Sequence, residues 1–327
     1  MKACILDGGV GDYTNLKITD IEEPQQISAN DIVIRHNAIG INFDDIMYRS
    51  GKYKIPKEIG EKPILGFEGV GEIIRKGDNV KSFKIGDMVG YACSPFGAYA
   101  EKRVIDYRYT FGVPNDIPYD ILAGSMRKGL TAEYLLFKTA NLRQNDTILI
   151  HSIAGGVGNI LAKWAKSLGL KVIGTIGSSD KMSIAMSTMC DLLINRSKDD
   201  IFDKVGEFTD YKGVKVVYDG IGKPVFDVSK HCLSPFGLYV SYGYAGGIID
   251  PIDLLSLQEN SLFFTAPRIE NYKSNRYELL CTISSVFKAL QKGTITPNLT
   301  KYTFNDIPQA HADLETKKTI GSIVVKL

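Results

Sequence analysis

The sequence predicts an α/β protein in which a β-rich region precedes a doubly wound parallel sheet. Two observations carry this prediction. Short apolar runs separated by glycine and proline fill the first hundred residues, and strand, turn and helix patterns alternate from residue 147 onward. The length of 327 residues favours two domains over one. Hydrophobic residues make up 44% of the chain, so both parts can bury a core.

In the N-terminal region, strand-like apolar runs lie at 33–36, 70–74 and 88–92. The segments 76–80 and 83–89 also have the pattern of two strands joined by turns. Helical spacing without proline then predicts a helix over 121–138.

Strands and helices then alternate, which indicates parallel strands joined by helical crossovers. The pattern predicts strands at 147–151, 171–176, 191–194, 213–218 and 237–242, and helices at 159–168, 181–189 and 224–232. After residue 264 it loosens into one long helix at 277–291 and a final strand at 320–326.

A glycine-rich turn separates the first of these strands from its helix. The turn is formed by Ala154, Gly155, Gly156, Val157 and Gly158. Backbone N–H groups at the start of a helix carry partial positive charge, and glycine allows a pyrophosphate to approach them closely. The turn therefore predicts a dinucleotide site, although a purely structural glycine turn in another α/β protein is the alternative.

The end of the next strand favours NADPH over NADH. NAD-preferring folds place an aspartate or glutamate there to hold the ribose 2′-hydroxyl, and this chain has none at the strand end. Ser178 and Ser179 could instead bond a 2′-phosphate, with Lys181 and Arg196 pairing with its charge. Asp180 favours NADH instead, since its carboxylate could accept a hydrogen bond from the ribose.

Two later strands also end in glycine-containing turns. Ile221 follows one, and Tyr242, Gly243 and Tyr244 follow the other. Ligands of doubly wound folds gather at the carboxyl ends of strands, so both turns are candidates for the nicotinamide side of the site. An ordinary loop is the alternative for each.

Composition excludes several classes of protein. The five cysteines are scattered without a CxxC pair, which argues against a disulfide framework or a four-cysteine zinc site. A net charge of +2 gives no support to nucleic-acid or membrane binding. No apolar run approaches the ~20 residues needed to span a bilayer, and no secretory signal is recognisable. We expect a soluble, cytoplasmic protein.

Short motifs in a fixed order carry a family resemblance. They are AIGINF at 38–43, YRSGKY at 48–53, GD at 86–87, GAYAE at 97–101, KGLTA at 128–132, AGGVG at 154–158 and WAK at 164–166. Together they resemble the zinc-independent quinone oxidoreductases, the zeta-crystallin-like group of the medium-chain dehydrogenase/reductase superfamily. The resemblance runs from Met1 to Leu327.

The resemblance implies a GroES-like catalytic domain over 1–122 and 266–327, a Rossmann domain over 123–265, a homodimer and bound NADPH. It implies that Asn42 and Phe43 lie beside the nicotinamide and that a quinone lies near Asn42, Asp45 and Tyr53. The remaining implied cofactor contacts are Thr131, 154–158, Gly177, Lys181, Arg196, Ile221, Tyr242, Gly243 and Tyr244.

The chain departs from the family pattern at several positions. Met47 stands where relatives often have tyrosine, Tyr244 replaces a smaller polar residue, and Ala266 stands where some bacterial relatives have arginine. These changes bear on the substrate pocket more than on the cofactor site.

The sequence also lacks the metal ligands of the zinc alcohol dehydrogenases of the same superfamily. Phe67 replaces the histidine of their Gly-His-Glu motif, and Asn42 to Asp45 occupy the place of the first cysteine. A catalytic zinc needs three protein ligands, so we expect no metal. Without a Lewis acid, an electrophilic substrate such as a quinone or activated enone is favoured over an alcohol.

The leading functional hypothesis is therefore NADPH-dependent reduction of a quinone or activated enone, an EC 1.6.5 type activity. An enoyl-thioester or alkenal reductase on the same fold is one alternative, since fold does not fix substrate. A weakly catalytic NADPH-binding protein with a structural or RNA-associated role is another, and the near-neutral charge weakens the RNA option.

Overall fold

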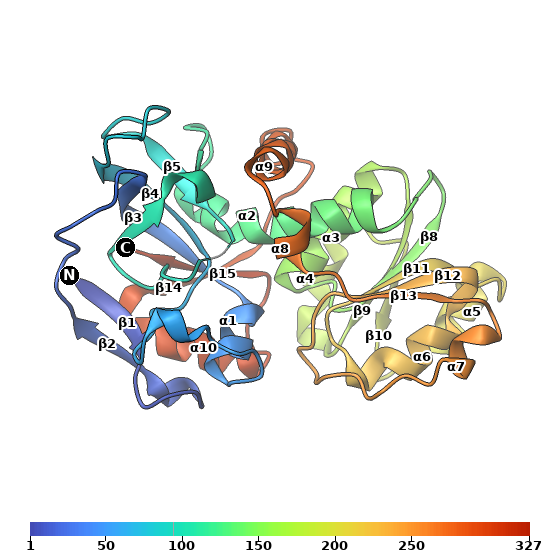
Figure 1. Cartoon of the computed structure of the whole chain (residues 1–327). Helices are drawn as coiled ribbons and strands as arrows, with labels where there is room; N and C mark the ends of the chain where they lie inside the picture. The colour runs from blue at the N-terminus through green and yellow to red at the C-terminus, as the bar shows by residue number, and fades with distance from the viewer. Residues whose placement is uncertain (94) are drawn as a thin grey trace. The chain divides into compact units, whose positions relative to one another are not determined.

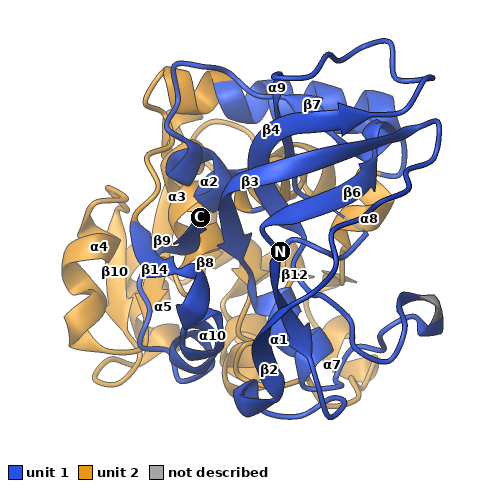
Figure 2. Cartoon of the chain, turned by 90° about the vertical axis from the view of Figure 1, so that its left-hand side faces the viewer, with its two compact units in different colours: residues 1–127, 274–287, 299–327 blue, residues 128–273, 288–298 orange. Residues whose placement is uncertain are grey.

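The computed structural model describes residues 1–93 and 95–327. Its chain divides into two compact units, coloured separately in Figure 2. Unit 1 comprises residues 1–127, 274–287 and 299–327, and unit 2 comprises 128–273 and 288–298. Helix α2 (Tyr119–Tyr134) runs from unit 1 into unit 2, and the boundary expected after residue 122 falls inside it. The domain limits expected from the sequence stay a prediction.

Unit 1 is built on a seven-stranded sheet with the order β14-β15-β3-β4-β5-β7, in which β6 also pairs with β3. All strand pairs of this sheet are antiparallel except β14 with β15. Because β15 pairs with β3, the C-terminal strand of the chain joins the N-terminal strands. The strands are β3 (Asp31–Ile41), β4 (Glu68–Lys76), β5 (Met88–Tyr91), β6 (Lys102–Asp106), β7 (Phe111–Gly112), β14 (Leu299–Thr303) and β15 (Ser322–Lys326). A separate antiparallel pair is formed by β1 (Lys2–Leu6) and β2 (Leu16–Asp20).

Apolar side chains from β3, β4 and β15 form the core of unit 1, together with residues of β1 and helix α10 (Ile307–Glu315). Ile34, Ile39 and Ile323 are among the core residues that are almost completely buried. This core fixes the end of β3, and helix α1 (Phe43–Arg49) begins directly after it. The rigid sheet therefore determines the position of Asn42, which lies between β3 and α1.

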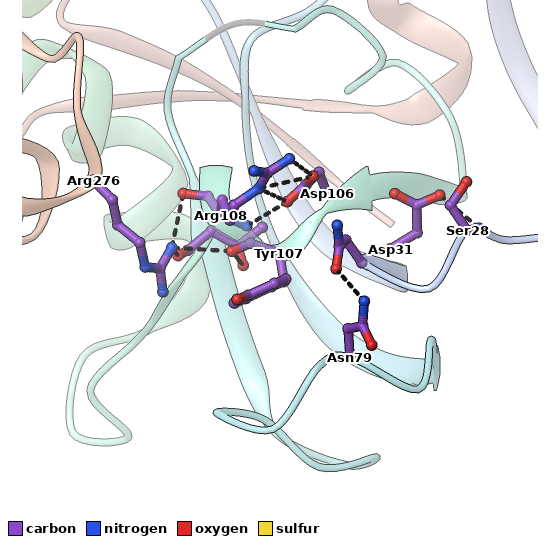
Figure 3. Close-up of polar contacts among 9 residues, drawn as sticks. Ser28, Asp31, Asn79, Asp106, Tyr107, Arg108 and Arg276 are labelled. Atoms are coloured by element: carbon purple, nitrogen blue, oxygen red, sulfur yellow. Dashed lines mark hydrogen bonds and ion pairs between the residues drawn. The ribbon is translucent and has the colours of Figure 1, made fainter.

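Arg276 attaches the first turn of helix α9 (Arg276–Gln291) to the connection between β6 and β7. Its Nη1 donates to the main-chain oxygens of Tyr107, Arg108 and Thr110 at 3.1, 2.7 and 2.9 Å, as Figure 3 shows for Tyr107 and Arg108. In the same view, Asp106 pairs with Arg108. These contacts hold a segment from late in the chain on the N-terminal sheet of unit 1.

Unit 2 contains a six-stranded parallel sheet with the order β10-β9-β8-β11-β12-β13. In chain order this is 3-2-1-4-5-6, the arrangement of the Rossmann fold, which confirms the predicted fold class. The strands are β8 (Thr147–Ile150), β9 (Lys171–Ile176), β10 (Leu192–Asn195), β11 (Val214–Asp219), β12 (Leu233–Ser241) and β13 (Phe263–Thr265).

Helices cover both faces of this sheet (Figure 1). Helices α3 (Gly156–Ser167) and α4 (Met182–Met186) lie on one face, and α5 (Ile201–Thr209) and α6 (Phe226–His231) lie on the other. Short helices α7 (Leu255–Gln258) and α8 (Ile269–Tyr272) follow. Single 3₁₀ turns lie at Tyr13–Asn15, Lys57–Ile59, Tyr107–Tyr109, Ser179–Lys181, Lys223–Val225 and Phe304–Asp306, and α2 continues as a π-helical turn at Leu135–Thr139.

The strands expected at 76–80 and 83–89 are wrong for most of their length. Strand β4 ends at Lys76 and β5 begins at Met88. Between them, Asp87 accepts the main-chain N–H of Lys84 at 2.9 Å, and the N–H of Gly86 bonds the oxygen of Ile73 at 2.9 Å. A local turn bond thus shapes 84–87, while Gly86 and Asp87 still bond the main chain of Ile73 on β4 just before β5 begins. Among the described residues, no helix has the length and apolar character needed to cross a membrane.

Candidate cofactor and substrate sites

The glycine-rich turn connects β8 to α3, at the point where the strand order of the sheet reverses. Gly155 is the N-cap of α3, and Gly156 and Gly158 belong to its first turn, so the helix begins earlier than expected. A Cβ on Gly158 would lie 2.4 Å from the main-chain oxygen of Ser152. Only glycine therefore allows the helix to pack this closely on the strand end. The N–H groups of a first helical turn have no partner within the helix, and such a helix end is suited to an anion.

Arg196 lies against the end of β9. Its Nη2 is 3.0 Å from the position that a Cβ on Gly177 would take. Its Nε is buried and has no hydrogen-bond partner among the described residues. Partial burial lowers the pKa of the Arg196 guanidinium, and the nearby Asp219 carboxylate opposes this. A partly buried guanidinium whose buried Nε has no partner among the described residues suits a phosphate group at this position.

Lys181 ends the 3₁₀ turn that follows β9, and its side chain is half-buried. The neighbouring Asp180 is exposed, and the pKa of its carboxyl is lowered by a hydrogen bond from Ser178 and by the charge of Lys181. Asp180 thus has partners on its own turn, which lessens its case as a ribose acceptor. The structure brings Gly177, Lys181 and Arg196 to adjacent strand ends.

The ends of β11 and β12 also meet. Asp219 is fully buried and accepts the N–H groups of Ile221 and Gly222 at 2.7 and 2.9 Å, which fixes the turn after β11. The Tyr242 ring lies 2.9 Å from where a Cβ on Gly220 would be. Burial raises the pKa of Asp219 to about 6 and shifts the pKa of Tyr242 upward. Ile221, Tyr242, Gly243 and Tyr244 therefore lie at neighbouring strand ends, as expected for one side of a ligand site.

In unit 1, Asn42 is held by two carboxylates. Its main-chain N–H donates to Asp45 Oδ2 at 2.8 Å, and its Nδ2 donates to Glu68 Oε2 at 3.2 Å. Asn42 is 7% exposed, whereas Asp45 is completely buried, and burial raises the pKa of the Asp45 carboxyl to about 7. Asp45 lies in the first turn of α1 and forms a capping box with the N-cap residue Asn42, and its contact with a substrate stays a prediction. Phe43, the first residue of α1, is half-buried.

Tyr53 belongs to an aromatic cluster, defined here as Tyr48, Tyr53, Phe67 and Phe96. Ring centroids are 5.3 Å apart for Tyr48 and Tyr53, 4.7 Å for Tyr48 and Phe96, and 4.6 Å for Phe67 and Phe96. Met47, which stands where relatives often have tyrosine, is buried at 2% exposure, and the neighbouring Tyr48 is the residue that belongs to this cluster. Phe67 is 1% exposed, whereas the other three rings are half-buried, with Tyr48 and Phe96 packed against the core of unit 1. Aromatic rings of this kind can pack against another flat ring.

The histidines of the two cores are structural. His151 Nε2 and Nδ1 lie 2.6 and 2.9 Å from the hydroxyls of Ser229 and Thr175. His36 contacts the oxygen of Ala100 and the hydroxyl of Tyr91, each at 2.6 Å. Burial lowers the pKa of His36 to about 4 and that of His151 to about 3, so both are neutral at pH 7. Within residues 1–93 and 95–327, no three His, Cys, Asp or Glu side chains gather as a metal site would require.

Sequence reasoning missed four residues that shape these sites. Glu68 is a buried carboxylate whose partners Asn42 and Arg127 are far from it in the chain, and Phe96 joins the aromatic cluster from another loop. Asp219 is also buried, and it bonds the turn that directly follows it. Asn159 is 1% exposed on α3, and its amide has no partner within the described part of the chain. Polar residues following a glycine turn or ending an apolar strand were the available signal for Asn159 and Asp219. The expected site residue Thr131 lies on α2 and is half-buried.

Family models match both halves of the chain. Residues 28–146 match the alcohol dehydrogenase GroES-like domain, and residues 156–278 match the zinc-binding dehydrogenase model. The first agrees with the β-rich unit 1 and the second with the parallel sheet of unit 2.

Individual relatives are similar over almost the whole chain. A quinone oxidoreductase of Pseudomonas aeruginosa is 37% identical over 305 residues, covering 93% of each chain. A 2-haloacrylate reductase of a Burkholderia species is 38% identical over 298 residues, covering 89% of each. The crystal structure of Escherichia coli quinone oxidoreductase complexed with NADPH is 34% identical, with a TM-score of 0.95 over 100% of both chains.

Proposed function

This chain belongs to the family of the quinone oxidoreductases, and from that premise we propose that it is an NADPH-dependent reductase of quinones or activated enones. One observation carries the proposal. At the end of β9, where a carboxylate would select NAD, the chain instead places the guanidinium of Arg196 against Gly177. The Nε of Arg196 has no hydrogen-bond partner among the described residues, so it suits the 2′-phosphate that distinguishes NADPH from NADH.

The proposed cofactor site follows the strand ends of unit 2. The first-turn N–H groups of α3 would bind the pyrophosphate, and Gly155 would let it approach. Gly177, Lys181 and Arg196 would surround the 2′-phosphate. Ile221, Tyr242, Gly243 and Tyr244 would line the nicotinamide end, with Thr131, Asn42 and Phe43 completing the contacts.

When bound, the reduced nicotinamide supplies a hydride. The residues of this chain then orient the acceptor and exclude water. We propose that the aromatic cluster packs on the substrate ring and that the Asn42 amide donates to a substrate carbonyl oxygen, where negative charge develops as hydride arrives. One proton from solvent completes the hydroquinone, because the hydride brings both electrons and the other hydrogen.

The proposed reaction needs no zinc. Phe67, which has no lone pair, stands where the zinc enzymes have a histidine, and it packs against Phe96 at 4.6 Å. A quinone is already electrophilic, so hydrogen bonds suffice where an alcohol would need a Lewis acid.

The direct experiment mixes the purified protein with NADPH and 1,4-naphthoquinone and follows the NADPH absorbance. We expect loss of absorbance that depends on both protein and quinone. No loss above the protein-free background would reject the proposal.

A second substrate class is supported by the relative named 2-haloacrylate reductase, which is 38% identical. An activated carbon–carbon double bond is electrophilic, as a quinone is, so it can accept hydride in the same way. Parallel assays with 1,4-naphthoquinone, an alkenal and crotonyl thioester separate these substrates. A kcat/KM highest for the thioester would favour the enoyl-thioester reductase alternative.

We also propose that the protein is a cytoplasmic homodimer. Strand β13 is the last strand of the parallel sheet, and Phe263 on it is 59% exposed. Ile248, Leu254 and Leu255 of the same unit are 57%, 77% and 72% exposed. Open strand edges and exposed apolar side chains are features that a second chain covers.

A further inference from the structure

Glu68 connects two parts of unit 1 through its buried carboxylate. It is the first residue of β4 and is completely buried. Oε1 accepts the main-chain N–H of Arg127 at 2.6 Å, and Oε2 accepts from Asn42 Nδ2 at 3.2 Å. A Cβ on Gly40 would lie 2.4 Å from Oε2, so glycine at that position makes room for the carboxylate.

Arg127 is itself fixed on several sides. Its Nη2 pairs with Asp44 at 2.6 Å, its Nη1 donates to the oxygen of Ala92 at 3.0 Å, and its guanidinium lies 4.6 Å from the centroid of the Phe67 ring. The side chain is 5% exposed in its ion pair. The main-chain N–H of Arg127, which donates to Glu68, is therefore fixed in position. Because the same carboxylate accepts from Asn42, Glu68 can fix the position of the Asn42 amide in turn.

An asparagine amide can present its two ends in either of two flipped orientations. A carboxylate only accepts hydrogen bonds, so it stabilises the orientation with Nδ2 toward Glu68 and opposes the one with Oδ1 toward it. The main-chain N–H of Asn42 is fixed separately by Asp45 at 2.8 Å. Asn42 and Asp45 also form a capping box, in which the Asn42 side chain accepts the main-chain N–H of Asp45. Glu68 therefore favours the same flip of the amide as the capping box does, and it is the partner of the Nδ2 end.

We propose that Glu68 is a positioning residue that sets the amide orientation of Asn42, so that Nδ2, which donates one N–H to Glu68, directs its second N–H to the substrate carbonyl oxygen. This inference rests on the proposed function. Reduction of the substrate then depends on the Glu68 carboxylate, which acts only through its hydrogen bond with Asn42.

The test is a double-mutant cycle with Glu68→Gln, Asn42→Ala and the double variant. A neutral glutamine at position 68 can pair with either end of the amide, so Glu68→Gln should lower kcat/KM for 1,4-naphthoquinone by about tenfold, the value of one charge-assisted hydrogen bond. In the Asn42→Ala background the same change should cost less than about twofold. Equal losses in both backgrounds would overturn the proposal.

The matched control is Glu72→Gln on the same strand, whose side chain is 33% exposed and pairs with Arg35. It should leave kcat/KM unchanged. A tenfold loss in the control would show that the effect of Glu68→Gln does not depend on its contact with Asn42, and the proposal would fail.

The exchanged pair Glu68→Gln with Asn42→Asp separates positioning from folding, and it serves even where Glu68→Gln alone is unstable. It restores an amide–carboxylate bond, so the melting temperature should return toward that of the parent chain. It presents a carboxylate to the substrate, so kcat/KM should stay low. Recovery of both quantities would contradict a role in orienting the amide.

A readout without turnover distinguishes this inference from the proposed function. The side-chain amide protons of Asn42, assigned by their loss in Asn42→Ala, should show one proton shifted downfield by the carboxylate in NMR spectra. Glu68→Gln should remove that shift whether or not the protein reduces quinones. An unchanged signal would overturn the inference, whereas absent quinone reduction with a shifted signal would reject only the proposed function.

Discussion

Replacing Arg196 with glutamine should separate the two nicotinamide cofactors. Arg196 directly follows β10 and lies beside Gly177, and desolvation lowers the pKa of its partly buried guanidinium. Glutamine keeps much of the side-chain volume but removes the charge. We expect weaker binding of NADPH and little change for NADH, because only NADPH carries the 2′-phosphate.

The size of the effect follows from the type of bond lost. A hydrogen bond to a charged group contributes about 1.5 to 3 kcal/mol in a protein. At about 1.4 kcal/mol for each factor of ten, the dissociation constant of NADPH should rise roughly 10- to 150-fold. The constant for NADH should change less than about threefold, since it loses no contact.

Isothermal titration calorimetry of both cofactors measures this difference directly. Lys204→Gln is the control, because Lys204 lies on α5, is 44% exposed and pairs with Glu207. It removes the same charge away from the strand ends and should alter neither constant. Equal weakening of NADPH and NADH by Arg196→Gln, or no weakening of NADPH, would refute the assignment of the phosphate to Arg196.

Three other expectations follow from the structure. Gly158→Ala should lower both the melting temperature and the affinity for NADPH, because the new Cβ would lie 2.4 Å from a main-chain oxygen and such overpacking costs about 1–3 kcal/mol. The control is Gly112→Ala, whose new Cβ has nothing within 4 Å and which should change neither quantity. Equal effects of the two substitutions would contradict this expectation. His36 has a pKa lowered to about 4, so its neutral form stabilises the fold above pH 6.5 and this contribution is lost as the pH falls toward 4. Urea unfolding should therefore show the stability advantage over His36→Gln shrinking by about 3 kcal/mol between pH 7 and 4, and a constant difference would disprove it. Phe263→Lys should convert a dimer to a monomer in light scattering after gel filtration, and an unchanged mass would reject β13 as the contact.

Local pattern predicted the parallel-sheet unit well. Strand β9 lies at the predicted 171–176, because its apolar run is buried on both faces and bounded by turn residues. Helix α3 starts at Gly156 although its helical pattern begins at Asn159, because glycine has low helix propensity and hides the first turn. Helix α5 went unrecognised, although Asp200 caps it by accepting the N–H of Asp203 at 3.0 Å.

The candidate sites were predictable where topology alone brings residues together. Parallel strands place their carboxyl ends at one edge, so the residues after β9, β10, β11 and β12 could be grouped without a structure. The network around Asn42 could not. Glu68 and Arg127 meet only because β3, β4 and α2 pack in unit 1, and no local spacing encodes that contact. The family resemblance was confirmed, and it supplied the GroES-like assignment that pattern reasoning could not reach.

The most direct test of the account is the initial rate of NADPH oxidation by 1,4-naphthoquinone after the protein has been treated with a strong zinc chelator and its metal content measured. The account predicts a quinone-dependent rate that survives chelation, with less than stoichiometric zinc and a higher kcat/KM for NADPH than for NADH. A rate that disappears with the metal and returns with added zinc, or a preference for NADH, would contradict it.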